Sequence, residues 1–275
     1  MHTKSLRIGL LSFLATILLI ACSQLAHPPP QSVQPSMVQP SAQASTLLVA
    51  AAASLQNSLQ AITPLYTQAN PNQTINYNFA ASGVLQQQIE QGAPVDVFIS
   101  AADKQMNALQ KKELLKSGIQ KNLLTNQLVL VVPKQSSLSL TDFQQLVKPD
   151  VKRISIGEPR SVPAGQYATE VLKNLGILKQ VQSKFVLGNN VKSVLTAVET
   201  GDVDAAIIYI TDAKSSDKIT IAATAKEQLH SPIRYPIAVL KSSQSPDAAQ
   251  QYVDFLQSPP AKAVFEKYGF GISKP

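Results

Sequence analysis

Two serines, Ser54 and Ser82, occupy positions where a side chain could bind an anion. Each follows an apolar strand pattern and small residues, and each precedes a helical pattern. Ser54 comes after Leu47 to Val49 and four alanines and is expected to be a helix N-cap; Ser82 comes after TINYNF and two alanines. A helix start presents unpaired N–H groups and the positive end of the helix dipole, and a serine hydroxyl adds an uncharged donor. Each stretch predicts an anion-binding turn, although an ordinary capped helix is the alternative interpretation.

Two later stretches predict helix starts of the same kind. Ala164 lies directly after Pro163, which suits the first turn of a helix, and the strand pattern RISIG precedes both. Asn190 is expected to cap a helix that begins near Val191, after the strand pattern KFVLG. A buried strand, VDAAIIY, ends at Tyr209 and presents a phenol hydroxyl at its carboxyl end.

Strand and helix patterns alternate from Leu47 onwards, which predicts an α/β fold with mostly parallel sheets flanked by helices. Two longer apolar strands, 127–133 and 235–240, are expected to cross between two lobes. One lobe would contain residues 47–125 plus 241–275, and the other residues 126–240. Open α/β folds bind ligands at the carboxyl ends of their strands, so the four helix starts should converge in the cleft between the lobes.

The four helix starts carry almost no positive charge. Lys192 is the only lysine or arginine within these turns, and Arg160 stands a few residues before Ala164. A fully deprotonated dianion can be held by helix dipoles and neutral donors alone, because all of its oxygens accept hydrogen bonds. The residues therefore favour binding of a small oxyanion.

The N-terminus predicts export and lipidation. Lys4 and Arg7 precede an apolar run that is too short to span a membrane comfortably, so residues 1–21 are expected to be a signal peptide. Leu19 to Cys22 resembles a bacterial lipobox, in which the cysteine is the lipidated first residue of the mature protein; a secreted protein with an incidental thiol is the alternative. Residues 22–46 contain five prolines and no charged residue, which is typical of a disordered tether.

Composition narrows the classes of function. Without Lys4 and Arg7 the chain has 22 basic and 17 acidic residues, a net charge of +5, and no basic run is interleaved with aromatics. Nucleic-acid binding is therefore poorly supported. Cys22 is the only cysteine and His230 the only histidine beyond the tether, so disulfides and thiolate metal sites are excluded and no metal-cation ligands are expected.

Six motifs occur in order between Leu47 and the C-terminus: AAASL (51–55), FAASGVLQQQIEQGAPVDVFISA (79–101), VPAGQYATEVL (162–172), NNVKSVL (189–195), AAIIYITDA (205–213) and FEKYGF (265–270). In these motifs the chain resembles a known family, the periplasmic molybdate-binding proteins of ABC molybdate transporters, over nearly all of its length from Leu47. The resemblance implies a two-lobed periplasmic-binding-protein fold of type II, with the ligand cleft between the lobes.

The resemblance also implies which residues bind the oxyanion. Matching motif to motif, the ligand-binding positions are Ser54, Ser82, Ala164, Val191 and Tyr209. The family often carries a second hydroxyl after the second serine, where this chain has Gly83. That glycine loses a donor side chain, but its N–H is expected to stay available.

The function that the resemblance implies is binding of molybdate, and of tungstate. The N-terminal pattern adds export and a lipid anchor, and a monomer is expected. That protein would deliver its cargo to the membrane permease of an ABC importer, with no cofactor and no catalysis. Binding of another tetrahedral oxyanion such as sulfate remains open. A serine hydrolase is disfavoured, because Ala52 and Gln56 flank Ser54 where a nucleophile elbow has glycines, and His230 lies in a polar stretch. A ligand-sensing module of a regulator is disfavoured by the signal peptide and by the lack of a preceding DNA-binding helix pair.

Overall fold

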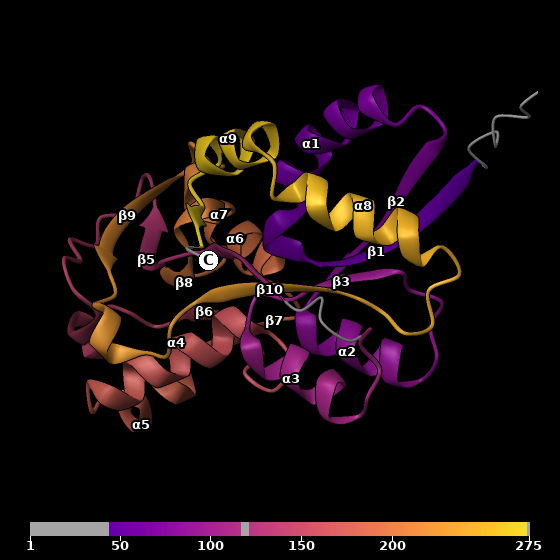
Figure 1. Ribbon diagram of the computed structural model, residues 1–275. Helices are drawn as coiled ribbons and strands as arrows, with labels where there is room; N and C mark the ends of the chain where they lie inside the picture. The colour runs from indigo at the N-terminus through magenta and orange to yellow at the C-terminus, as the bar shows by residue number, and fades with distance from the viewer. Residues whose placement is uncertain (1–43, 117–120, 274–275) are drawn as a thin grey trace, which may run out of the picture. The chain divides into compact units, whose positions relative to one another are not determined.

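The computed structural model describes residues 44–116 and 121–273, which form two β-sheets and the helices packed on them (Figure 1). The first sheet has six strands. Their order is β11 (Gly271–Ile272), β4 (Lys121–Thr125), β10 (Arg234–Val239), β3 (Val97–Ile99), β1 (Ser45–Ala52) and β2 (Gln73–Ala80). Strand β1, next to the edge strand β2, pairs in parallel with β2 and β3, whereas β10 is antiparallel to both β3 and β4.

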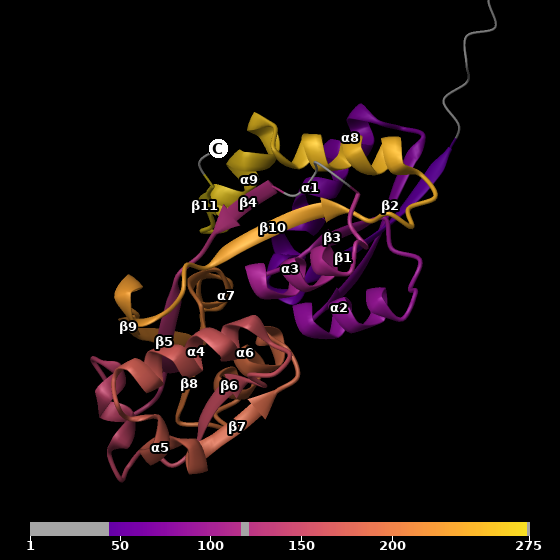
Figure 2. The same cartoon turned by 60° about the horizontal axis from the view of Figure 1, so that its bottom comes forward.

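Helices cover both faces of the six-stranded sheet, as Figures 1 and 2 show. One face carries α1 (Gln56–Ala69), α8 (Pro246–Leu256) and α9 (Pro259–Lys267), and the other carries α2 (Ser82–Glu90) and α3 (Asp103–Lys111). Successive residues of a strand point to opposite faces, so Val49 and Ala51 pack with Leu59, while Ala50 packs with Leu85 and Met106. Because helices cover both faces, residues 47–52 of β1 form a continuous apolar run.

The second sheet has five strands. Their order is β7 (Phe185–Gly188), β6 (Ile154–Gly157), β8 (Ala205–Tyr209), β5 (Leu128–Pro133) and β9 (Ile219–Thr224). The strand β6 is parallel to β7 and β8, and β5 is antiparallel to β8 and β9, so this sheet is mixed like the first. Two helices, α4 (Pro163–Asn174) and α6 (Val191–Glu199), pack on it, and α7 (Ile210–Lys214) directly follows β8.

Short helical segments complete the described chain. These are η1 (Ala53–Leu55), η2 (Phe143–Val147), α5 (Leu178–Val181), η3 (Gln182–Lys184) and η4 (Glu227–Leu229). Within the described residues, no helix combines the length and the apolar character needed to cross a membrane. The predicted signal peptide, Cys22 and nearly all of the predicted tether lie outside those residues.

The course of the chain between the sheets differs from the expected one. We expected residues 235–240 to belong to the second lobe, but β10 pairs with β3 and β4 and therefore lies in the six-stranded sheet. The predicted crossing strand 127–133 lies in the five-stranded sheet, and an unpredicted strand, β4, precedes it in the other sheet. The chain thus passes between the sheets at Asn126 and Gln127, and again over residues 225–233.

Candidate anion-binding site

A small cavity of about 10 Å³ brings together all five predicted ligand residues. The first two, Ser54 and Ser82, follow strands of the six-stranded sheet, and the other three belong to elements of the five-stranded sheet. Most of the remaining lining is small or apolar: Ala52, Ala53, Ala80, Ala81, Ala101, Val162 and Pro163. Small residues let the main chain approach a ligand closely.

The position of Ser54 follows from the end of β1. The alanines after Val49 turn the chain into η1, a short 3-10 segment, and α1 begins two residues after Ser54. Our expectation that Ser54 caps this helix is wrong, because its hydroxyl makes no capping bond. Instead, Ser54 Oγ lies 3.0 Å from the Tyr235 hydroxyl oxygen on β10, and the side chain is buried.

The hydroxyl of Ser82 is oriented by the main chain. Ser82 is the first residue of α2, where backbone N–H groups have no partner within the helix. Its Oγ accepts a 3.0 Å hydrogen bond from the N–H of Ala101, which leaves the serine proton free to be donated. The N–H of Gly83, however, donates to the carbonyl oxygen of Ser161 at 2.9 Å, so our expectation that it stays available to a ligand is wrong.

Two helix starts of the other sheet supply main-chain donors. Pro163 is the first residue of α4 and has no N–H, so Ala164 carries the first N–H of this helix. The predicted cap is confirmed at Asn190, whose Oδ1 accepts from the N–H groups of Lys192 and Ser193. That cap does not use the N–H of Val191. The residue Val191 itself lines the cavity.

Tyr209 provides a buried donor without a partner. It ends β8 with 1 % of its surface exposed, and its hydroxyl oxygen has no hydrogen-bond partner among the described residues. Burial raises the pKa of Tyr209 well above its usual value, so the phenol keeps its proton. Leaving such a group unpaired costs about 1–3 kcal/mol, which a hydrogen-bonding ligand in the cavity would recover.

The charged residues that stand next to the lining residues in the sequence form ion pairs. Lys192 Nζ lies 3.0 Å from Oδ1 of Asp212, a fully buried carboxylate on α7. Burial raises the pKa of Asp212, and the Lys192 ammonium acts in the opposite direction. Arg160 pairs with Glu158 at 3.1 Å, and its side chain is 90 % exposed. The residues that line the cavity are all uncharged, and no cluster of three or more His, Cys, Asp or Glu among the described residues could hold a metal ion.

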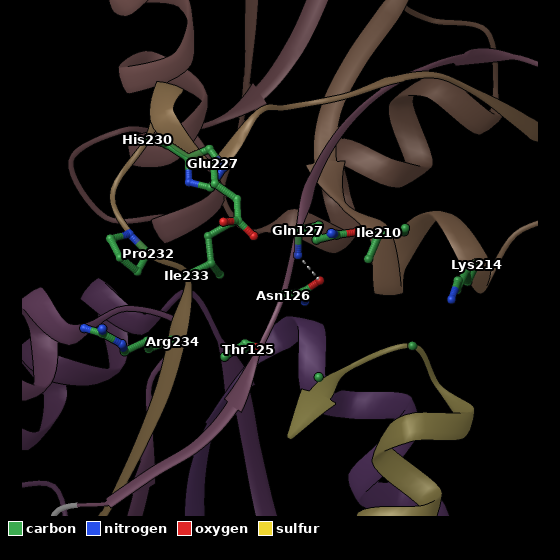
Figure 3. Close-up of a pocket in the computed structure, with 12 residues that line it drawn as sticks. Thr125, Asn126, Gln127, Ile210, Lys214, Glu227, His230, Pro232, Ile233 and Arg234 are labelled. Carbon is green, nitrogen blue, oxygen red and sulfur yellow. Dashed lines mark hydrogen bonds between the residues drawn. The ribbon is translucent and has the colours of Figure 1, made fainter. Parts of the chain in front are cut away.

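A larger cavity, of about 460 Å³, lies beside Asn126 and Gln127 and contains none of the five residues (Figure 3). His230 and Glu227 line it. The Nδ1 atom of His230 is 2.8 Å from the carbonyl oxygen of Ser231, whereas Ser54 contacts Tyr235. The serine and histidine on which a hydrolase would depend are thus engaged with other groups.

The sequence analysis did not identify Tyr235 and Asn126, which are connected to Ser54 by hydrogen bonds. The Asn126 Nδ2 donates to the Tyr235 hydroxyl oxygen at 3.0 Å and to Thr211 Oγ1 at 2.9 Å. Tyr235 in turn contacts Ser54, which is 181 positions away in the chain. No local pattern signals such a connection, because it exists only after the strands pair.

Two mixed sheets covered by helices, with helix starts gathered at one small cavity, define a two-lobed binding protein of the periplasmic type. Residues 47–271 match the family model of bacterial extracellular solute-binding proteins, and the chain belongs to this family.

Three similar proteins illustrate the relationship. YvgL of Bacillus subtilis, named as a candidate ABC transporter substrate-binding lipoprotein, is 41% identical over 225 residues, covering 82% of this chain and 86% of YvgL. The molybdate-binding protein ModA of Haemophilus influenzae is 35% identical over 225 residues, covering 81% of this chain and 88% of ModA. The solved substrate-binding domain of a candidate molybdenum ABC transporter from Clostridium difficile has a TM-score of 0.66 and 41% identity, covering 83% and 99% of the two chains.

Proposed function

We propose that this chain is an exported binding protein that captures molybdate, and tungstate, for delivery to the membrane permease of an ABC importer. The observation that carries the proposal is the unpartnered hydroxyl of Tyr209, buried in a cavity that Ser54, Ser82, Ala164 and Val191 also line. The identity to the ModA protein of Haemophilus influenzae supports molybdate as the cargo.

The chemistry of the donors suits a fully deprotonated tetrahedral anion. Hydroxyl and main-chain N–H groups donate to oxygens that only accept, and the helix starts add favourable dipoles. The nearby Lys192 is neutralised by Asp212, so the negative charge of the ligand would be balanced by many partial charges. The same groups hold no activated nucleophile, and we propose that the protein is not an enzyme and needs no cofactor.

The proposed location is the outer face of a membrane. After removal of residues 1–21, lipid on Cys22 would anchor a monomer through the tether. The lipobox-like Leu19 to Cys22 supports this proposal, as does the similarity to YvgL, whose name includes the term lipoprotein. A tether of this composition would let the binding domain reach the permease.

Calorimetric titration with molybdate tests the proposed function. We expect saturable binding of one molybdate per chain, weakened by ~1–3 kcal/mol in Ser82→Ala, because a hydrogen bond to a charged ligand is lost. Ser58→Ala is the matched control, since Ser58 is also a buried serine but donates to the carbonyl oxygen of Leu55, away from the cavity lining. Absence of molybdate binding, or an equal loss in both variants, would contradict the proposal.

A further inference from the structure

A chain of hydrogen bonds runs from the crossing between the sheets to the anion site. It begins at Asn126, between β4 and β5, passes through Tyr235 on β10 and ends at Ser54. Each link is about 3.0 Å long. The direction in which each proton is donated can be worked out from groups whose roles are fixed.

The amide of Asn126 sets that direction. Its Oδ1 accepts a 2.9 Å hydrogen bond from the main-chain N–H of Gln127, which can only donate (Figure 3). The Nδ2 group therefore faces Thr211 and Tyr235, and its two protons are used by the bonds to those two hydroxyl oxygens. An amide nitrogen accepts no hydrogen bond, so Tyr235 must send its own proton elsewhere.

Ser54 is the acceptor of that proton. Tyr235 is fully buried, and its described hydrogen-bond partners are Asn126 and Ser54. Burial raises the pKa of Tyr235 above its usual value, so the phenol stays protonated. If Ser54 donated to Tyr235, the phenol proton would have no acceptor at hydrogen-bond distance among the described residues, because the neighbouring Tyr209 hydroxyl makes no hydrogen bond. Such a buried, unpaired donor is costly. The low-cost arrangement has Tyr235 donating to Ser54 and the Ser54 proton directed into the cavity.

We infer that Asn126 and Tyr235 are positioning residues that fix Ser54 as a donor and so select anions whose oxygens carry no proton. This inference rests on the proposed function and deepens it. Ser82 is fixed in the same sense by the Ala101 N–H. Each serine then directs its proton into the cavity, so the protonated oxygen of an anion such as hydrogen phosphate meets a donor there instead of an acceptor.

The substitution Asn126→Asp should reverse the donor direction of the hydrogen bonds from residue 126 to Ser54, and it changes the shape of the side chain little. A carboxylate has no proton to donate, so Tyr235 would donate to it, and the Ser54 hydroxyl would donate to Tyr235. A lone pair of Ser54 would then face the cavity and could accept the proton of hydrogen phosphate. The added negative charge weakens the binding of both molybdate and hydrogen phosphate. The ratio of the two affinities therefore reports the direction of the Ser54 hydroxyl.

The experiment is a competition titration of the purified protein with molybdate and inorganic phosphate at mildly alkaline pH. We expect Asn126→Asp to lower the molybdate-to-phosphate affinity ratio by about tenfold or more. Tyr252→Phe is the matched control, because Tyr252 is a buried tyrosine that contacts Tyr77 at 2.8 Å, and it should leave the ratio unchanged.

A double-mutant cycle in molybdate affinity provides the second readout. Tyr235→Phe should weaken binding by about three- to tenfold, and Ser54→Ala should then cost at least about threefold less than it does in the parent. An unchanged molybdate-to-phosphate affinity ratio in a folded Asn126→Asp variant would overturn this inference, and so would strictly additive effects in the cycle. Neither result would contradict the proposed function. A parent that binds no molybdate would contradict the proposed function and the inference with it.

Discussion

The main-chain N–H of Gly83 donates a 2.9 Å hydrogen bond to the carbonyl oxygen of Ser161, and a side-chain carbon at Gly83 would lie 2.6 Å from that oxygen. Gly83 is in α2, which packs on the six-stranded sheet, and Ser161 precedes α4 of the other sheet. This bond therefore joins the two sides of the anion site. Only glycine permits so close an approach of two main chains here.

Gly83→Ala should hold the two sides of the site apart. Accommodating the added methyl group against main-chain atoms costs about 1–3 kcal/mol, which predicts a tenfold to hundredfold loss of molybdate affinity. In the ligand-free protein, the free energy of unfolding should fall by less than the free energy of molybdate binding does, because separation of the two sides relieves the contact. Calorimetric titration together with thermal unfolding measures both effects, and an unchanged affinity would contradict this explanation.

Molybdate should favour a closed arrangement of the two lobes, because its donors come from both sheets. We propose that the hinge lies at Asn126 and Gln127 and over residues 225–233. Small-angle scattering with and without molybdate measures closure, and hydrogen exchange reports protection at the hinge. Identical scattering profiles combined with unchanged exchange at these residues would argue against closure there.

Asp212→Asn should change how stability depends on pH. Burial raises the pKa of Asp212 above its value in the unfolded chain, with Lys192 opposing the effect. The folded state therefore holds this proton more tightly, so the stabilising contribution is complete below the unfolded pKa and is lost as pH rises through the folded pKa. The unfolding free energy of Asp212→Asn, relative to the parent, should increase from acidic to neutral pH. Urea denaturation of the ligand-free protein over that range checks the sign, and a flat or falling difference would refute it.

Cys22→Ser tests the proposed lipid anchor. A serine cannot accept the thioether-linked lipid, so the variant should leave the membrane fraction and its precursor should be processed abnormally. Fractionation of cells and mass measurement of the exported protein follow both effects. A variant that stays membrane-bound after normal processing would show that Cys22 is not the anchor.

The five cavity residues could be predicted because each lies in a local pattern of strand, turn and helix. Consecutive residues are enough to indicate where a buried strand ends, as at Tyr209, and where a helix starts, as at Asn190. The resemblance to molybdate-binding proteins then joined these local signals into one site. Tyr235 and Asn126 could not be found in this way, because their contacts with Ser54 and Thr211 arise from strand pairing across long separations.

Three strands escaped prediction: β4, β9 and the two-residue β11; the first two did so for a related reason. In β4 only Leu123 and Leu124 are buried, and β9 is an edge strand whose side chains are largely exposed or half-buried. Neither has the continuous apolar run of a buried strand or a clear alternation. The wrong placement of residues 235–240 has another cause: apolar strands of either sheet look alike, and only the pairing of β10 with β3 and β4 decides between them.

The most direct test of the central claim is a competition titration at neutral pH with molybdate, tungstate, sulfate and phosphate. The neutral donors predict that molybdate and tungstate bind most tightly, with similar affinities. The smaller sulfate should follow, and then phosphate. Hydrogen phosphate should bind about tenfold to hundredfold more weakly than molybdate, because its proton would meet a donor. Ser54→Ala and Ser82→Ala should each weaken molybdate binding by ~1–3 kcal/mol. Phosphate binding as tight as that of molybdate, or parental affinity in both serine variants, would contradict the account.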